Sequence, residues 1–586
     1  MDNIYLDRKL LWRVLKYATP YKFLFASTAI LALVLAPVSV ASPVLINKMV
    51  DDYIVSSIDI DGMTIWMIYL VGVILLHAAL QYLFIYTTNL LGQLVIRDIR
   101  VKVFNHLVKL DLRFFDLTPI GTSTTRTIND IESINNIFKQ GIITIIADVV
   151  GIFVVLITMF TISIKLTIIC LITMPFMILA SYWFKESVKK AYQKVRNQIS
   201  RMNSFLQERI TGMRIVQIFQ AEDQEMEKFK AINRKYTQAN LDSIFAYAVF
   251  FPVVEILSAI SLGLMVWWGA RGVLDESVTL GALIAFPLFL NRLFRPIRMI
   301  ADKFNTLQMG LVAAERIFKV LDTDPAIVDS GNYTKDKVEG SIEFKNVNFA
   351  YDGKNKVIHD LNFKVAPGET LAIVGSTGSG KTTIINLLNR FYDIKEGQIL
   401  IDGVNIQKYE LEALRSHLAI VLQDVFLFSG TIFENITLTD PRFTMEDVIK
   451  ASKIIGAHPF LESLPGGYDF KVTERGYNLS MGQRQLISFV RALVFDPDIL
   501  ILDEATSSID TETESVIQHA IETLIQKRTS IIIAHRLSTV RHADQVMVMK
   551  NGRAVEIGSH EELLQKDSGH YRKLYDLQFI EHPLEN

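Results

Sequence analysis

The sequence predicts an all-α membrane domain of six helices followed by an α/β domain, and three observations predict this fold class. Six apolar stretches lie before residue 300, and none alternates polar and apolar residues as a membrane barrel strand does. Beyond residue 340, short β-rich runs alternate with helical patterns, which is typical of an α/β domain with a largely parallel sheet. A chain of 586 residues is also too long for a single hydrophobic core.

Each apolar stretch is near the roughly 20 residues that a helix needs to cross the bilayer core. We place the spans at residues 23–45, 64–90, 141–162, 166–184, 244–268 and 278–294. Before them, Leu10 to Tyr17 combines apolar and basic residues, a pattern suited to a helix in the membrane interface. The one cysteine, Cys170, lies in an apolar run and is expected to be a packing residue. A net charge of −2 gives no reason to expect a nucleic-acid partner.

Basic residues set the expected orientation. They are concentrated in the long segments after the second and fourth spans, whereas the first short loop carries four aspartates. The positive-inside rule then predicts that both termini and both long loops face the cytoplasm. We expect a multi-pass protein of the cytoplasmic (inner) membrane of a bacterium. The long loops keep a helical spacing of apolar residues, so the spans are expected to continue as helices. Turns near 114–119 and 213–221 predict short helices that dock against a cytoplasmic domain, although plain helical hairpins are the alternative.

The domain boundaries follow from a change in composition. Residues 321–340 are rich in Asp, Thr, Pro, Ser, Asn, Lys and Gly, which indicates a surface linker. We therefore predict a transmembrane domain over residues 1–320, a linker over 321–340 and a nucleotide-binding domain over 341–586. The nucleotide-binding assignment rests on the two motifs described next.

The first motif is a phosphate-binding loop (P-loop). Gly375 to Thr382 matches the pattern G-x-x-x-x-G-K-[ST], between a predicted strand and a predicted helix. Glycines let backbone N–H groups wrap phosphate oxygens, and the helix presents its positive end to the same anion. Lys381 is expected to reach the β- and γ-phosphates of ATP, and Thr382 to bind Mg²⁺. The second domain is therefore predicted to be an α/β P-loop ATPase domain.

The second motif is an apolar strand that ends in two carboxylates, Asp503 and Glu504. A strand apolar on both faces fits the centre of a parallel sheet, and the carboxyl end of such a strand is where α/β domains place ligand chemistry. Asp503 is expected to hold the Mg²⁺ shell, and Glu504 to polarise the attacking water in a phosphoryl transfer. The alternative is a structural, salt-bridged pair.

With these two motifs, the second half resembles the nucleotide-binding domain of ATP-binding-cassette transporters, and the first half resembles the membrane domain of exporters in that family. The resemblance covers essentially the whole chain. It implies that Tyr351 stacks on adenine, that Gln423 contacts Mg²⁺ and water, and that His535 senses the γ-phosphate beside the catalytic Glu504. The implied ATP-binding residues are Tyr351, Gly375, Ser376, Thr377, Gly378, Ser379, Gly380, Lys381, Thr382, Thr383 and Gln423. The implied Mg²⁺ residues are Thr382, Gln423 and Asp503.

The family signature matches Leu479 to Gln483, with one departure. Ser480, Gly482 and Gln483 agree with the family pattern, but Met481 stands where the family has glycine. The resemblance implies that this segment contacts ATP bound to a second subunit, so one chain is half of a dimer. A homodimer is expected, and an obligate heterodimer is the alternative that Met481 suggests.

The implied function is ATP-hydrolysing export of a hydrophobic or amphipathic compound, drug-like or lipid, by alternating access. The alternative function is an ATP-gated channel or regulator, because such a protein would keep the same motifs. Cargo candidates are the ionisable residues inside the spans, Glu255, Asp148 and His77. If Glu255 and Asp148 line the cavity, lipophilic cations are the expected cargo; packing between helices is the alternative.

Overall fold

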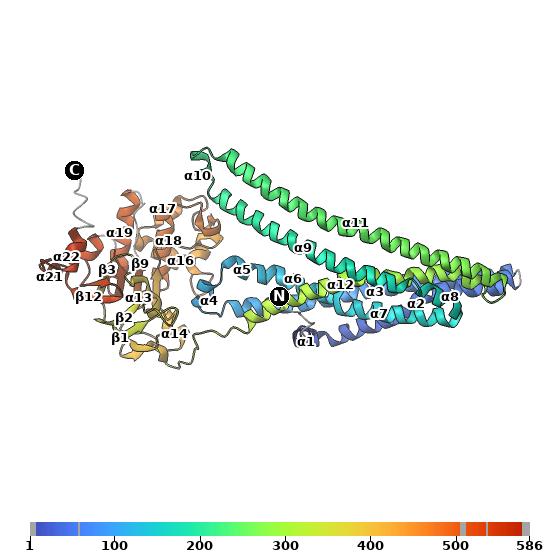
Figure 1. Cartoon of the computed structure of the whole chain (residues 1–586). Helices are drawn as coiled ribbons and strands as arrows, with labels where there is room; N and C mark the ends of the chain where they lie inside the picture. Colours follow the sequence, from blue (N-terminus) through green and yellow to red (C-terminus); the bar gives the residue numbers. More distant parts are fainter. Residues whose placement is uncertain (1–7, 57–58, 504–510, 535–536, 577–586) are drawn as a thin grey trace. The chain divides into compact units, whose positions relative to one another are not determined.

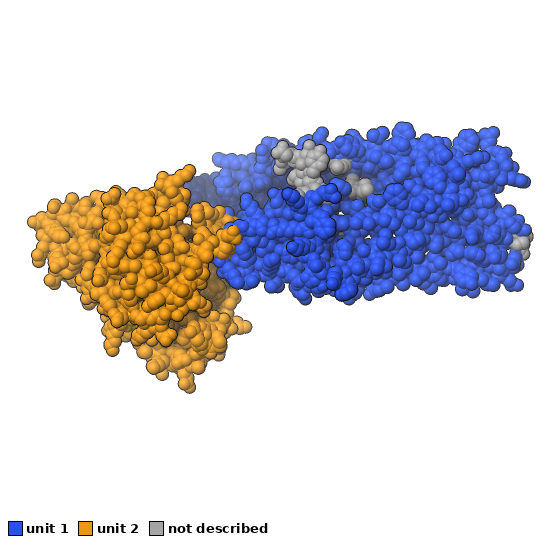
Figure 2. All heavy atoms as spheres, turned by 90° about the horizontal axis from the view of Figure 1, so that it is seen from below, with its two compact units in different colours: residues 1–109, 119–323 blue, residues 110–118, 324–586 orange. Residues whose placement is uncertain are grey.

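The computed structural model describes residues 8–56, 59–503, 511–534 and 537–576. The chain forms two compact units (Figures 1 and 2). The first contains residues 1–109 and 119–323, and the second contains residues 110–118 and 324–586. The second unit therefore includes a short piece of the first long loop between membrane spans.

The first unit is all-helical. Among the described residues, six helices or helical runs are long and apolar enough to cross a membrane, which confirms the predicted six-helix domain. Their main helices are α2 (Lys22–Val50), α3 (Ile60–Leu107), α7 (Ile142–Ile162), α8 (Ile164–Leu171), α9 (Met174–Thr211), α11 (Glu222–Leu274) and α12 (Leu280–Leu321). The shorter helices α5 (Ile120–Thr125) and α6 (Ile131–Asn136) belong to the third run, together with α7, and α1 (Arg8–Lys16) precedes the first run. Many large apolar side chains are exposed on this unit, as lipid-facing helices require.

Several helices extend well beyond the bilayer thickness. α3 has 48 residues, so at 1.5 Å per residue it is about 70 Å long against a hydrocarbon core of about 30 Å. α9 and α11 lie side by side along most of their length (Figure 1). α12 also continues to Leu321, although Pro287 and Pro296 lie inside it. The fourth span is divided between α8 and α9, and Pro175 lies in the first turn of α9, where a missing N–H group costs little.

A short helix lies at each predicted loop tip. α4 (Leu112–Leu117) begins at Asp111, whose carboxylate accepts a hydrogen bond from the Phe114 amide at 3.1 Å. α10 (Met213–Ile218) lies between α9 and α11. Ile218 and Phe219 at this tip are each 75% exposed. The two tips therefore differ, since α4 belongs to the second unit and α10 to the first.

The second unit contains two main sheets. The antiparallel sheet has the order β2-β1-β4-β5, with β1 (Ile342–Phe349), β2 (Ile358–Val365), β4 (Glu396–Ile401) and β5 (Val404–Asn405). The other sheet has the order β12-β11-β3-β10-β9-β6, with β3 (Thr370–Gly375), β6 (Leu418–Val421), β9 (Ile499–Asp503), β10 (Thr529–Ile533), β11 (Gln545–Lys550) and β12 (Arg553–Gly558). A small pair joins β7 (Gly430–Thr431) to β8 (Lys471–Val472). The parallel pairings of β3, β6, β9, β10 and β11 confirm the predicted α/β class.

Helices cover the larger sheet of this unit. They are α13 (Lys381–Leu388), α14 (Leu411–Ser416), α15 (Ile432–Thr437), α16 (Met445–Ile455), α17 (His458–Ser463), α18 (Met481–Val494), α19 (Thr511–Ile525), α20 (Leu537–Arg541), α21 (His560–Leu564) and α22 (His570–Tyr575). Alternate residues of β9 enter two different cores. Leu500 and Leu502 pack with α16, α18 and α19, whereas Ile499 and Ile501 pack toward the antiparallel sheet. This two-sided burial explains the unbroken apolar run of the strand.

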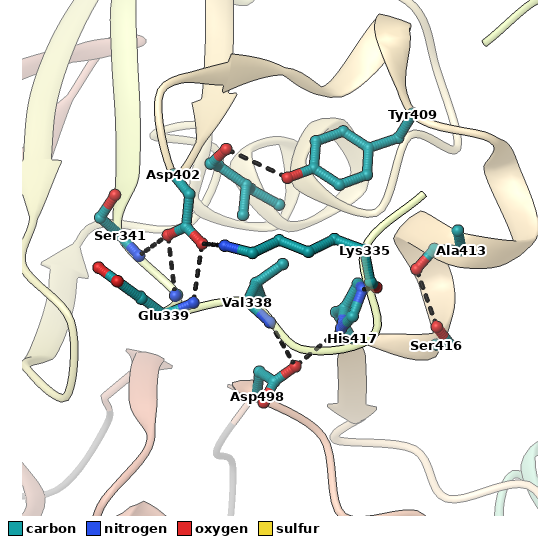
Figure 3. A network of polar contacts seen from close by, with 12 residues as sticks. Lys335, Val338, Glu339, Ser341, Asp402, Tyr409, Ala413, Ser416, His417 and Asp498 are labelled. Atoms are coloured by element: carbon teal, nitrogen blue, oxygen red, sulfur yellow. Dashed lines mark hydrogen bonds and ion pairs between the residues drawn. The ribbon is translucent and has the colours of Figure 1, made fainter. Parts of the chain in front are cut away.

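A polar network fixes the segment that leads into β1 (Figure 3). Asp402 accepts hydrogen bonds from the amides of Glu339, Gly340 and Ser341 at 2.7, 3.0 and 2.9 Å, and from Lys335 Nζ at 3.2 Å. A second group lies beside it. Asp498, directly before β9, accepts a bond from the Val338 amide at 3.2 Å and contacts His417 Nδ1 at 2.7 Å.

We expect Asp402→Asn to loosen this segment, because an amide group would then face backbone N–H donors. Burial raises the pKa of Asp402, but the bonds from Glu339, Ser341 and Lys335 outweigh it, so the pKa is lowered overall. The charged bonds therefore stabilise the segment above the unfolded pKa of about 3.9, and this stability is lost as the pH falls through the folded value. The expected loss is about 1.5–3 kcal/mol of local opening free energy.

Hydrogen exchange of residues 339–341 in the full chain measures this effect. The matched control is Asp352→Asn, since Asp352 also accepts two backbone bonds, from Lys354 and Asn355, but belongs to an exposed turn. Unchanged exchange in Asp402→Asn at pH 7 would show that the network does not hold the segment.

Candidate nucleotide site

The loop between β3 and α13 has a backbone that requires glycine. Gly378 and Gly380 have φ values of 79° and 104°, in the region that favours glycine. Gly375 has a φ of 155°, and a Cβ atom added there would lie 2.3 Å from the carbonyl oxygen of Met549. Within the loop, the Ser379 amide donates to the Ser376 carbonyl at 3.1 Å. The P-loop pattern therefore corresponds to a real turn, directly before the N-terminus of a helix.

Lys381 is the first residue of α13 and is buried. Its Nζ donates to the carbonyl oxygens of Gly375 at 2.7 Å and Ser376 at 3.1 Å. Burial lowers the pKa of Lys381, and the carboxylate of Asp503 opposes that shift. The ammonium group is thus held against the P-loop by neutral carbonyls and has an acidic group nearby.

The strand order brings the two sequence motifs to one edge of the sheet. β10 pairs in parallel with both β3 and β9, and Ile533 is opposite Ile373 on one side and Asp503 on the other. The carboxyl ends of these strands therefore meet at one edge. Glu504 directly follows β9 in the sequence, and His535 follows β10 with one residue between, but both lie outside the described residues.

Tyr351 lies beside α13, just after β1. Its hydroxyl donates to Thr383 Oγ1 at 3.1 Å and accepts a bond from Asn386 at 3.3 Å. Its ring makes edge contacts with Phe349 and Tyr392, at centroid distances of 4.8 and 4.9 Å. The structure thus brings Tyr351 together with Thr383, one of the predicted ATP-binding residues.

Tyr392 makes a contact that the sequence does not predict. The Tyr392 hydroxyl donates to the carboxylate of Asp116 on α4. Burial, followed by this bond, raises the pKa of Tyr392. The same tyrosine contacts Tyr351, so one side chain links the aromatic group next to α13 with the tip of the first long loop. Asp116 and Tyr392 are 276 residues apart, and no local pattern pairs them.

The signature segment forms a well-capped helix start. The Ser480 hydroxyl accepts a bond from the Gln483 amide at 3.2 Å, and the Gln483 side chain accepts one from the Ser480 amide at 2.9 Å. Met481 is the first residue of α18 and is 39% exposed, whereas Gly482 is buried. Methionine at this position therefore leaves the capping box intact. Gln423, in the loop after β6, is exposed.

The three cargo candidates lie on three different helices. Asp148 on α7 forms an ion pair with Lys303 on α12, and both side chains are partly buried. Glu255 on α11 is exposed, and His77 on α3 is half-buried. Asp148 is therefore engaged by a neighbouring helix. Cys170 is fully buried, as expected for a packing residue.

Six membrane helices joined to a P-loop domain define a membrane protein that uses nucleotide. Two family profiles match the chain: the ABC transporter transmembrane region over residues 25–297 and the ABC transporter domain over residues 358–507. The chain belongs to the ABC (ATP-binding-cassette) transporters.

Individual relatives agree with this assignment. An uncharacterised ABC transporter ATP-binding protein of Bacillus subtilis is 41% identical over 97% of this chain and 94% of its own length. The ATP-dependent lipid A-core flippase of Desulfotalea psychrophila is 35% identical over 98% of this chain and 100% of its own length. A bacterial Atm1-family ABC exporter, solved with ATP bound, has a TM-score of 0.78 at 30% identity and covers 94% of this chain and 98% of its own.

These findings define the activity at the level of the family. The chain is an ATP-driven exporter, and its second unit contains a nucleotide-binding ATPase domain. It has the fold of a half-transporter, which implies dimerisation with another half-transporter.

Proposed function

We propose that this chain exports a hydrophobic or amphipathic compound, drug-like or lipid, across a bacterial cytoplasmic membrane. The observation that carries the proposal is Lys381, buried at the P-loop beside Asp503, in a chain whose six spans expose apolar side chains. Relatives named for multidrug resistance and for lipid A-core flipping support the cargo class. Both termini and the nucleotide-binding domain over residues 341–586 lie in the cytoplasm in this proposal.

The proposed catalytic site uses residues at one edge of the sheet. Lys381 binds the terminal phosphates, Tyr351 stacks on adenine, and Glu504 accepts the proton of the attacking water. Attack at the γ-phosphorus breaks its bond to the bridging oxygen, so that ADP and phosphate form. His535 orients the γ-phosphate. The remaining P-loop residues supply backbone N–H groups.

Mg²⁺ fits this site by the chemistry of its donors. Thr382 offers an exposed hydroxyl, and Asp503 offers a carboxylate at the end of β9. Gln423 adds an exposed amide oxygen. Oxygen ligands of this kind, together with phosphate, are what Mg²⁺ prefers. When bound, the ion neutralises charge on the phosphates.

A homodimer completes the site in this proposal. The N-terminus of α18, with Ser480, contacts ATP bound to the other chain, because the positive end of a helix is suited to binding an anion. The exposed apolar tip at Ile215, Ile218 and Phe219 packs against the nucleotide-binding unit of the mate. A heterodimer is the second candidate, and Met481 is the observation that favours it.

The test is to reconstitute the purified chain in lipid vesicles and to measure ATP hydrolysis and cargo movement together. Drugs, lipids and peptides are screened, and cationic dyes are compared in the wild type and in Glu255→Gln. If lipophilic cations are cargo, we expect dye stimulation of the ATPase to fall severalfold in Glu255→Gln. Glu276→Gln, in the loop after α11, is the matched control.

Three outcomes distinguish between the candidate cargoes, between a pump and a channel, and between a homodimer and a heterodimer. Unchanged dye stimulation in Glu255→Gln would remove the lipophilic-cation assignment. Dye movement that only follows its gradient would favour a channel over a pump. A stable and cooperative ATPase from this chain alone would favour the homodimer over the heterodimer.

A further inference from the structure

Helix α1 has one face that packs against its own unit. Val14 is fully buried, and Ala18, just after the helix, is 4% exposed. Both lie in a hydrophobic cluster with Ile317 and Phe318, near the end of α12. The inward face of α1 therefore rests on the last turns of the helix that ends the first unit.

The outward face of α1 combines cations with exposed aromatic groups. Trp12 is 71% exposed, and Phe23, at the start of α2, is 81% exposed. Arg8 and Lys16 are exposed and have no ion-pair partner among the residues that the structure describes. Lys16 and Trp12 also line a shallow groove together with Arg13, Leu15 and Thr19.

This face belongs to the segment that directly precedes the first candidate membrane span. α1 ends at Lys16, and α2 begins at Lys22 and lies within the first candidate span. Tryptophan and basic side chains are the residues that settle at the level of lipid headgroups. Anionic headgroups attract such a surface, and each Lys or Arg close to the membrane strengthens binding to it about fivefold.

Helix α1 is also bonded to the end of α12. Arg13 donates two hydrogen bonds to the carboxylate of Asp322, at 2.7 and 2.5 Å, and its guanidinium lies 4.1 Å from the centroid of the Phe318 ring. Tyr17 stacks on Phe318 at 5.9 Å. The hydrogen bond from Arg13 lowers the pKa of Asp322, so the pair is charged at neutral pH. Asp322 is the C-cap of α12, after which the chain continues into the second unit.

We propose that the outward face of α1 binds the phosphate headgroups of anionic phospholipids, and that Arg13 transmits this binding to the end of α12, where it sets the ATPase rate. Arg8 and Lys16 attract the headgroup, while Trp12 inserts beside it. The bidentate bond to Asp322 then couples the position of α1 to the last turn of α12. The lipid acts as a regulator, so this inference depends on the ATPase activity of the chain and not on the identity of its cargo.

The test uses the full chain in nanodiscs of phosphatidylcholine with 0–40 mol% phosphatidylglycerol. We expect the wild-type ATPase rate to rise about three- to tenfold across this range. Arg8→Gln combined with Lys16→Gln removes two cations, so about 25-fold more anionic lipid is needed and the response disappears from the range. The control is Lys450→Gln combined with Lys453→Gln, the same charge change on exposed positions of α16.

The coupling step has its own measurement. The Trp12 fluorescence is the part of the protein's fluorescence that is absent in Trp12→Phe. In Arg13→Gln, this fluorescence should still respond to anionic lipid, while the ATPase response is lost. Asp322→Asn should give the same result through the other partner. A full ATPase response in both variants would overturn the role of the pair. A normal lipid response of the Arg8 and Lys16 double variant, or equal stimulation by inorganic phosphate, would overturn the lipid site.

Discussion

Replacing Lys381 with alanine is expected to reduce the ATPase rate by at least about 100-fold. The ammonium group is buried at the P-loop, where it bonds, among the described residues, to two carbonyl oxygens of the same loop. Carbonyls give up such bonds to a phosphate at little cost, because a charged acceptor binds an ammonium group more strongly than a neutral one does. Removing one well-placed cation from a phosphoryl-transfer site typically costs 10²–10³ in rate.

Two comparisons make this prediction specific. Lys356→Ala removes a cation that pairs with Glu396 on the surface of the same unit, and its rate should stay within about twofold of the wild type. Lys381→Arg should recover only part of the activity, since a planar guanidinium does not reproduce a compact ammonium in a buried position. Steady-state hydrolysis with nucleotide binding measured in parallel separates the effects. A Lys381→Ala rate within threefold of the wild type would rule out the proposed role.

The features predicted well from sequence are those whose physical cause is local. A membrane span can be recognised because it needs about 20 consecutive apolar residues. Each of the six predicted spans overlaps one of the six candidate spans of the structure. The P-loop is recognisable because the glycines and the lysine must occur at fixed spacing along one turn. The apolar run before Asp503 identified a central strand, because both of its faces are buried.

The features that were missed depend on contacts between distant parts of the chain. Nothing near Tyr392 in the sequence indicates that its hydroxyl bonds to Asp116. In the sequence, Asp402 resembles an ordinary turn residue, yet in the structure it accepts four hydrogen bonds from the segment before β1. The sequence shows Asp148 as a charge inside a span, but its partner Lys303 is evident only from the packing of α7 against α12.

Replacing Glu504 with glutamine is the second change expected to have a large effect. Glu504 lies outside the described residues, but it directly follows Asp503, the last residue of β9. Removing a general base typically lowers a rate by 10²–10⁴-fold, whereas the amide keeps the size of the side chain and should leave ATP binding intact. The variant should therefore hold Mg-ATP without hydrolysing it, and a dimer closed around two nucleotides should accumulate.

A disulfide assay detects that closed dimer. In a Cys170→Ser background, cysteines replace Ser376 in the P-loop and Met481 at the start of α18, both of which are exposed. A disulfide forms only when the two Cα atoms lie within about 7 Å, so its formation between chains reports that one P-loop faces the other chain's signature helix. We expect cross-linking in Glu504→Gln with Mg-ATP and little without nucleotide. Cysteines at Ser376 and Lys450 serve as the control pair. Absence of the cross-link, with ATP binding verified, would contradict the shared site, because nucleotide contacted by Lys381 of one chain and Ser480 of the other must bring these positions together.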